Sequence, residues 1–177
     1  MSSSYVTCPD VSWCLPPEIL TLGCDEVHVW RAGLNVTPSQ LHRLNQTLAV
    51  EKLIRTNRFI FDKDRNYYIV ARGVLRCILG QYLSVEPSKV RFSYGLFGKP
   101  ELAEEASGEN ISFNLSHTHG VALYAITRRG RRVGIDVELV RPNIDNEKIA
   151  QRFFSPREAS AINALPAIMH QEAFFKC

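Results

Sequence analysis

The sequence has no run of about 18 apolar residues, so it offers no candidate for a transmembrane helix. The first residues, Met1 to Tyr5, lack the basic and then apolar pattern of a secretion signal. Both absences favour a cytoplasmic protein.

Paired cysteines are also absent. The five cysteines form no Cys-x-x-Cys motif, which argues against a zinc ribbon and against a disulfide scaffold. His117 and His119 have no close Cys or His pair to complete a zinc site. No Gly-x-Ser-x-Gly motif occurs, so the most recognisable form of serine hydrolase is excluded as well.

Charge of one sign is not in large excess. Twenty-one Lys and Arg face eighteen Asp and Glu, for a net charge of +3. This mild basicity suits anionic partners in general but is too balanced to indicate nucleic-acid binding. With 177 residues, 45% of them apolar, the chain is long enough to bury a core as one compact domain.

Periodicity predicts an α+β fold. Residues 1–24 are expected to form an irregular leader. Thr37, Pro38 and Gln40 predict a helix start with a capping box, and Ser155 with Glu158 predicts another. The strongest helix is expected over about 64–83, and its arginines, Arg72 and Arg76 among them, are interpreted most simply as a solvated face. Strands are expected over 26–30, 90–94, 111–116, 121–126 and 133–140. Segregated hairpins and helices favour α+β over a doubly wound sheet.

Two acids stand close together near the end of the last expected strand. Asp136 and Glu138 are two residues apart among Val, Gly and Ile, so alternation places both side chains on one face. Two like charges there repel unless a cation lies between them, and Mg²⁺ accepts one or two carboxylates together with phosphates and water. Spacing alone favours two solvated acids on a hairpin edge over a metal site.

Other residues suit phosphate binding. Ser116 and His117 end a strand with a hydroxyl and an imidazole, although polar side chains at a strand end are common. Lys99 stands between Gly98 and Pro100, in what could be any surface turn. Lys52 and Arg55 form a basic pair at helical spacing.

The order of these elements is more specific than any one of them. It runs through Lys52 and Arg55, Arg58-Phe59 with Asp64-Arg65, Gly98-Lys99-Pro100, Phe113-Asn114-Leu115-Ser116-His117, Gly134-Ile135-Asp136-Val137-Glu138 and Arg152-Phe153-Phe154-Ser155. This order resembles the Sfp-type 4′-phosphopantetheinyl transferases over roughly residues 25–177.

The resemblance implies an enzyme that moves 4′-phosphopantetheine from coenzyme A to a serine of an acyl or peptidyl carrier protein, as a holo-acyl-carrier-protein synthase does, and releases 3′,5′-ADP. It implies Mg²⁺ held by Asp136 and Glu138, which would bridge the pyrophosphate. It implies partners that are neither nucleic acid nor membrane. The coenzyme A contacts it implies are Lys52, Arg55, Lys99, Ser116 and His117.

The implied fold is a pair of similar α+β halves with coenzyme A between them. Residues 25–132 are expected to form the N-terminal half, and 133–177 the beginning of a truncated C-terminal half. The family's Trp-x-x-Lys-Glu motif, with its catalytic Glu and Lys, is expected beyond Cys177. An alternative is therefore an inactive remnant that binds coenzyme A or a carrier protein without transfer.

Four arginines lie in the turn just before residue 133, and they either meet an acidic carrier protein or are merely solvated: Arg128, Arg129, Arg131 and Arg132.

Overall fold

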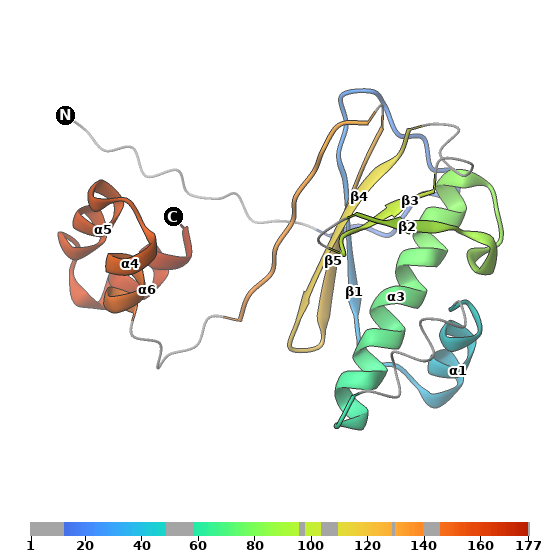
Figure 1. Ribbon diagram of the computed structural model, residues 1–177, viewed down its shortest axis with the longest axis horizontal. Helices are drawn as coiled ribbons and strands as arrows, with labels where there is room; N and C mark the ends of the chain where they lie inside the picture. The colour runs from blue at the N-terminus through green and yellow to red at the C-terminus, as the bar shows by residue number, and fades with distance from the viewer. Residues whose placement is uncertain are drawn as a thin grey trace.

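A computed structural model of the chain describes residues 13–48, 59–95, 98–103, 110–128, 130–139 and 146–176 (Figure 1). Its elements are β1 (His28–Gly33), α1 (Pro38–Gln46), α3 (Asp62–Leu83), the 3-10 helix η1 (Pro87–Lys89), β2 (Phe92–Tyr94), β3 (Pro100–Leu102), β4 (Ser112–Thr118), β5 (Val121–Thr127), α4 (Asn146–Phe153), α5 (Pro156–Asn163) and α6 (Ala167–Lys176). The predicted α+β class is confirmed. Within these ranges no helix is long and apolar enough to cross a membrane.

The main sheet has three strands in the order β1-β5-β4, and both pairings are antiparallel. β4 and β5 form a hairpin whose turn residues, His119 and Gly120, have φ values of 41° and 85°. Positive φ at both positions is the geometry of a two-residue type I′ turn, which glycine adopts easily. The hairpin expected from the sequence is confirmed, whereas β1 lies a few residues later than the predicted strand.

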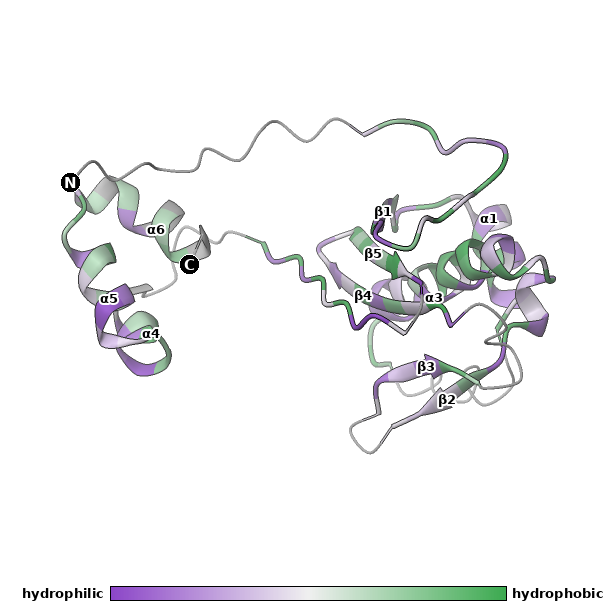
Figure 2. Ribbon diagram, turned by 90° about the horizontal axis from the view of Figure 1, so that it is seen from above, coloured by the Kyte–Doolittle hydropathy of each residue, from purple (hydrophilic) through white to green (hydrophobic). Residues whose placement is uncertain are grey.

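Helix α3 covers one face of this sheet (Figure 1). Strand alternation places Phe113 and Tyr124 on the covered face, where both are buried. The Tyr124 hydroxyl donates to the carbonyl of Ala71 on α3 at 3.1 Å. Burial raises the pKa of Tyr124, so the hydroxyl keeps its proton and remains a donor. In Figure 2 the hydrophobic colour gathers on α3 and β5, where the core lies.

Arg76 corrects the expectation of a solvated arginine face on α3. Its side chain is 4% exposed, and its guanidinium donates to the carbonyls of Pro87 and Val90, each at 2.9 Å. The same group lies over the ring of Phe92, 5.2 Å from its centroid. Helical periodicity gave no sign of this, because the bonded carbonyls belong to the loop after the helix. Arg76 thereby fixes the position of the β2–β3 pair.

Close packing between α1 and α3 depends on Gly73. A Cβ atom at this position would lie 2.8 Å from the Cβ of Leu44 on α1.

The predicted capping box that starts α1 is present, since Thr37 and Gln40 bond reciprocally. The one predicted at Ser155 and Glu158 is present at the start of α5.

Helices α4, α5 and α6 form their own cluster (Figure 1). The rings of Phe154 and Phe174 stack within it with 5.2 Å between centroids. His170 lies 2.7 Å from the Leu165 carbonyl through its Nε2. Pro166 lies between two of these helices, since α5 ends at Asn163 and α6 begins at Ala167.

We expect Gly73→Ala to lower the free energy of unfolding by about 1–3 kcal/mol, because the added methyl group overpacks the α1–α3 contact. Gly33→Ala is the matched control, since a Cβ there meets nothing within 4 Å. It should change stability by less than about 0.5 kcal/mol. Urea denaturation of both variants measures this, and equal stabilities would contradict the packing argument.

Candidate functional site

The segment 131–139 runs beside β4 without becoming a strand. A strand was expected over 133–140; residues 131–139 contain no ladder pairing, and Val140 lies outside the described residues. Side chains of β4 bond its backbone instead. The amide of Ile135 donates to Asn114 Oδ1 at 3.5 Å, and that of Val137 donates to Ser116 Oγ at 3.3 Å. The prediction of a strand was wrong because side-chain acceptors take the place of a second backbone.

The predicted alternation of the acidic pair nevertheless holds. Ile135 and Val137 are half-buried, whereas Asp136 and Glu138 are exposed, as expected for an extended segment with one inward face. The Ser116 hydroxyl donates to Asp136 Oδ1 at 2.6 Å. Ser116 therefore accepts from the Val137 amide and donates to the neighbouring carboxylate, which fixes both backbone and side chain at Asp136.

Two carboxylates on one exposed face are too few to hold a metal by protein ligands alone, but they suit Mg²⁺. Mg²⁺ keeps several waters and takes one or two carboxylates together with substrate phosphates. Among the described residues no group of three or more His, Cys, Asp or Glu side chains gathers in a way that could hold a metal ion. Asp136 and Glu138 thus fit an open site that a phosphate ligand completes.

Ser116 and His117 lie on opposite faces of β4, because side chains of neighbouring strand residues alternate. Ser116 bonds Asp136 on one face. His117 lines a cavity of about 610 Å³ on the face covered by α3, together with Lys63 and Arg72. The sequence placed both residues together at the end of a strand, whereas in the structure they have different neighbours.

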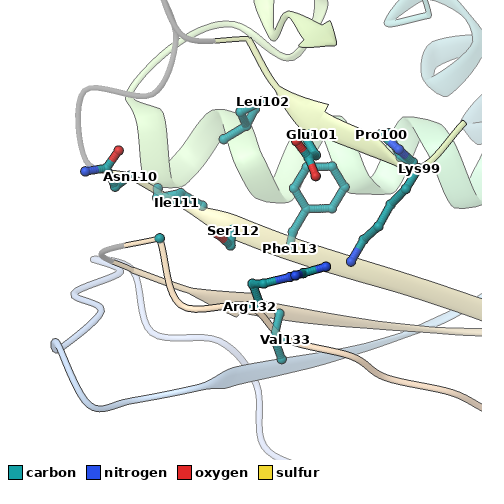
Figure 3. Close-up of a pocket in the computed structure, with 11 residues that line it drawn as sticks. Lys99, Pro100, Glu101, Leu102, Asn110, Ile111, Ser112, Phe113, Arg132 and Val133 are labelled. Carbon is teal, nitrogen blue, oxygen red and sulfur yellow. The ribbon is translucent and has the colours of Figure 1, made fainter. Parts of the chain in front are cut away.

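Lys99 lies beside a second cavity, of about 560 Å³, between β3 and the start of β4 (Figure 3). Gly98 precedes it with a φ of 71°, and the Gly95 amide donates to the Lys99 carbonyl at 3.2 Å. Arg132 lines the same cavity from the opposite side. With Lys99 and Arg132 against the single carboxylate of Glu101, the lining of this cavity carries a net positive charge.

The remaining predicted basic residues have different outcomes. Lys52 and Arg55 lie outside the described residues, as does Arg129. Arg128 donates to the Leu22 carbonyl at 2.9 Å, and Arg131 to the Cys24 carbonyl at 3.3 Å. These two arginines contact the segment before β1, so neither is merely solvated, and their contact with a carrier protein stays a prediction.

Sequence reasoning missed three cavity residues: Lys63, Arg72 and Arg132. One signal for the first two existed in helical spacing. Lys63 lies over the ring of Tyr67, and Arg72 over the ring of Tyr68, each pair separated by one helical turn. No comparable signal marked Arg132.

The fold and these cavities define an α+β protein whose β4 strand is flanked by basic and carboxylate groups from other elements, and such groups suit a phosphate-bearing ligand. A family model described as the 4′-phosphopantetheinyl transferase N-terminal region matches residues 33–128. The chain is 44% identical over 165 residues to the 4′-phosphopantetheinyl transferase HetI of Nostoc sp., which covers 93% of this chain and 69% of HetI.

Two further relatives come from Bacillus. A 4′-phosphopantetheinyl transferase of Bacillus subtilis is 26% identical over 69% of this chain and 51% of its own length. A 4′-phosphopantetheinyl transferase of Bacillus pumilus is 31% identical over 77% of this chain and 55% of its own length. This chain therefore belongs to the 4′-phosphopantetheinyl transferase family and is a transferase by homology, as the order of its motifs predicted.

Removal of the Ser116 hydroxyl should release the segment that carries Asp136. We expect Ser116→Ala to raise the amide hydrogen-exchange rate of Val137 about fivefold, since one net hydrogen bond contributes about 1 kcal/mol. Thr118→Val is the control, because the Thr118 hydroxyl contacts only its neighbour His119 among the described bonds. An unchanged rate at Val137 in Ser116→Ala would contradict the assigned bond.

Proposed function

We propose that this chain transfers 4′-phosphopantetheine from coenzyme A to a serine of an acyl or peptidyl carrier protein, with Mg²⁺ as cofactor. The observation that carries the proposal is the acidic pair of Asp136 and Glu138, exposed on one face with Asp136 oriented by Ser116, in a member of this family. Two neighbouring carboxylates, one of them oriented by a hydrogen bond, suit a metal held beside a phosphate.

Coenzyme A is long, and β4 supplies a track for it. The cavity beside Lys99 borders Ser112, and the cavity of His117 lies toward the other end of the strand. At about 3.4 Å per residue, these two strand positions are about 17 Å apart. We assign phosphate contacts to Lys99 and His117, which line these two cavities. Ser116 lies on the other face and donates its one hydroxyl proton to Asp136, so its proposed phosphate contact rests on the family resemblance alone. Lys52 and Arg55 are proposed contacts on the family resemblance alone.

The residues described above supply some, but not all, of the groups that the reaction requires. The carrier serine oxygen forms a bond to the β-phosphorus of coenzyme A, the bond from this phosphorus to the bridging oxygen breaks, and 3′,5′-ADP leaves. Mg²⁺ bound by Asp136 and Glu138 would offset the negative charge on the pyrophosphate. Ser116 keeps Asp136 in position, so no reorganisation is needed when the ligand arrives. Because Trp-x-x-Lys-Glu does not occur in residues 1–177, we assign no proton acceptor.

The larger arrangement is proposed on the same basis. Residues 25–132 would form the N-terminal half of a two-part fold, and residues from 133 onward would begin a second half, with coenzyme A between them. The carrier protein would approach the open face of the acidic pair. We place this activity in the cytoplasm.

The decisive test is transfer of labelled phosphopantetheine from coenzyme A to a purified acyl carrier protein with Mg²⁺ present. We expect transfer by the chain, and a loss of about a hundredfold or more in Asp136→Asn, because removal of a ligand carboxylate leaves the metal under-held. Chelation of Mg²⁺ should abolish the reaction. Glu86→Gln is the control, since it removes an exposed carboxylate away from both cavities.

Calorimetry with coenzyme A, compared with the transfer assay, distinguishes the proposed transferase from a chain that only binds. Binding without transfer would support a chain that holds coenzyme A or a carrier protein and lacks catalysis. The specific observation in its favour is that the acidic pair has no third acidic partner among the described residues. Label transfer that depends on Asp136 would exclude this alternative.

A further inference from the structure

Arg132 and Lys99 approach one cavity from different parts of the chain. Arg132 follows the turn after β5, and Lys99 precedes β3. In Figure 3 the guanidinium of Arg132 and the amine of Lys99 extend toward one another across the opening. Two positive charges that converge repel one another, and an anion between them converts this repulsion into attraction.

In the part of the chain that the structure describes, neither cation has a carboxylate partner that would explain the convergence. Among the described residues, no ion pair within 4 Å involves Lys99 or Arg132. Glu101 also lines the cavity and is exposed, but it makes no such pair with either cation. Arg128 and Arg131, from the same turn, are used differently, since both donate to backbone carbonyls.

The backbone on the N-terminal side of Arg132 is held firmly. The buried Thr127 hydroxyl donates to the Arg131 carbonyl at 2.8 Å. The Gly130 amide donates to the Asn110 carbonyl at 2.9 Å, which ties the turn to the start of β4. A long side chain on a fixed backbone loses less freedom when it binds a ligand, so Arg132 is partly preorganised.

The rest of the cavity is suited to an organic phosphate. Its inner wall includes Leu102, Ile111 and Phe113, all buried and apolar, with the polar Ser112 between the last two. A volume of about 560 Å³ is within the range of small-molecule sites. An apolar wall behind two cations favours a phosphate ester that carries a ring system over a free inorganic ion.

The position of Arg132 relative to the acidic pair gives the ligand a direction. Arg132 precedes Asp136 by four residues in an extended segment, and both are exposed on the same side. Their Cα atoms are therefore about 13 Å apart. A ligand that places a metal-bound phosphate at Asp136 would present its other end to Arg132.

From these observations we infer that Arg132 is a coenzyme A-binding residue that clamps, together with Lys99, one phosphate of the nucleotide part. The inference rests on the proposed function, because coenzyme A supplies the ligand. It reassigns Arg132 from the surface of a turn to the ligand site. Arg132 acts here by binding and takes no part in proton transfer.

Calorimetric titration of the whole chain with coenzyme A tests the clamp through Lys99→Gln, Arg132→Gln and the double variant. We expect each single change to weaken binding about tenfold, as for loss of one charge-assisted hydrogen bond. The double variant should lose clearly less than the product of the two, because both cations hold one phosphate. Arg132→Lys should recover part of the affinity. Arg157→Gln, an equal loss of charge on α5, should bind as wild type.

Dephospho-coenzyme A identifies the phosphate. If the Arg132→Gln penalty disappears with this ligand, the clamp holds the 3′-phosphate; if the penalty persists, it holds the pyrophosphate. Wild-type affinity in Arg132→Gln, or strictly multiplicative losses in the double variant, would overturn the clamp and leave the proposed function intact. Failure of the wild-type chain to bind coenzyme A would instead refute the proposed function. Circular dichroism of each variant checks that it remains folded.

Discussion

The antiparallel register of β4 with β5 is the constraint on which the site depends. Leu115 lies opposite Tyr124, and Ser116 opposite Leu123. Because the side-chain period of a strand is two, a shift of one residue would turn Ser116 toward α3 and expose Leu115 beside the acidic segment. Burial of Tyr124 and its bond to Ala71 on α3 disfavour that shift. The core thus sets the orientation of every polar side chain on β4.

This register turns neighbouring polar residues of β4 toward opposite faces, where they have different roles. On one face, Asn114 and Ser116 take up the backbone of the segment that carries Asp136. On the other, His117 borders a cavity with Arg72. The edge position of β4 makes the first task possible, since its second side has no strand partner among the described elements. A paired strand there would satisfy the amides of Ile135 and Val137 by itself and leave Ser116 with less control over Asp136.

Local sequence patterns predicted the helices, caps and hairpin better than they predicted how these elements pack together. Helix α3, both capping boxes, the β4–β5 hairpin and the alternation at Asp136 follow from rules that act over a few residues, and all were predictable. The burial of Arg76 was not, because its partners are carbonyls of a loop whose path depends on the whole core. The absence of a strand at 131–139 was equally hidden, since alternation is the same whether backbone or side chains provide the bonds. The roles of the predicted site residues stay predictions.

The turn after β5 shows why counting charges along a sequence does not predict what each charged side chain contacts. Arg128, Arg131 and Arg132 have the same side chain and nearly the same position, yet two of them bond the segment before β1 and the third faces a cavity. Alternation separates Arg132 from Arg131 and places it on the same side as Asp136. One extended segment therefore carries a cation at one end and carboxylates at the other. In the proposed complex, a polyphosphate ligand would meet the first directly and the second through a metal, so the two ends of the segment would bind different parts of the ligand.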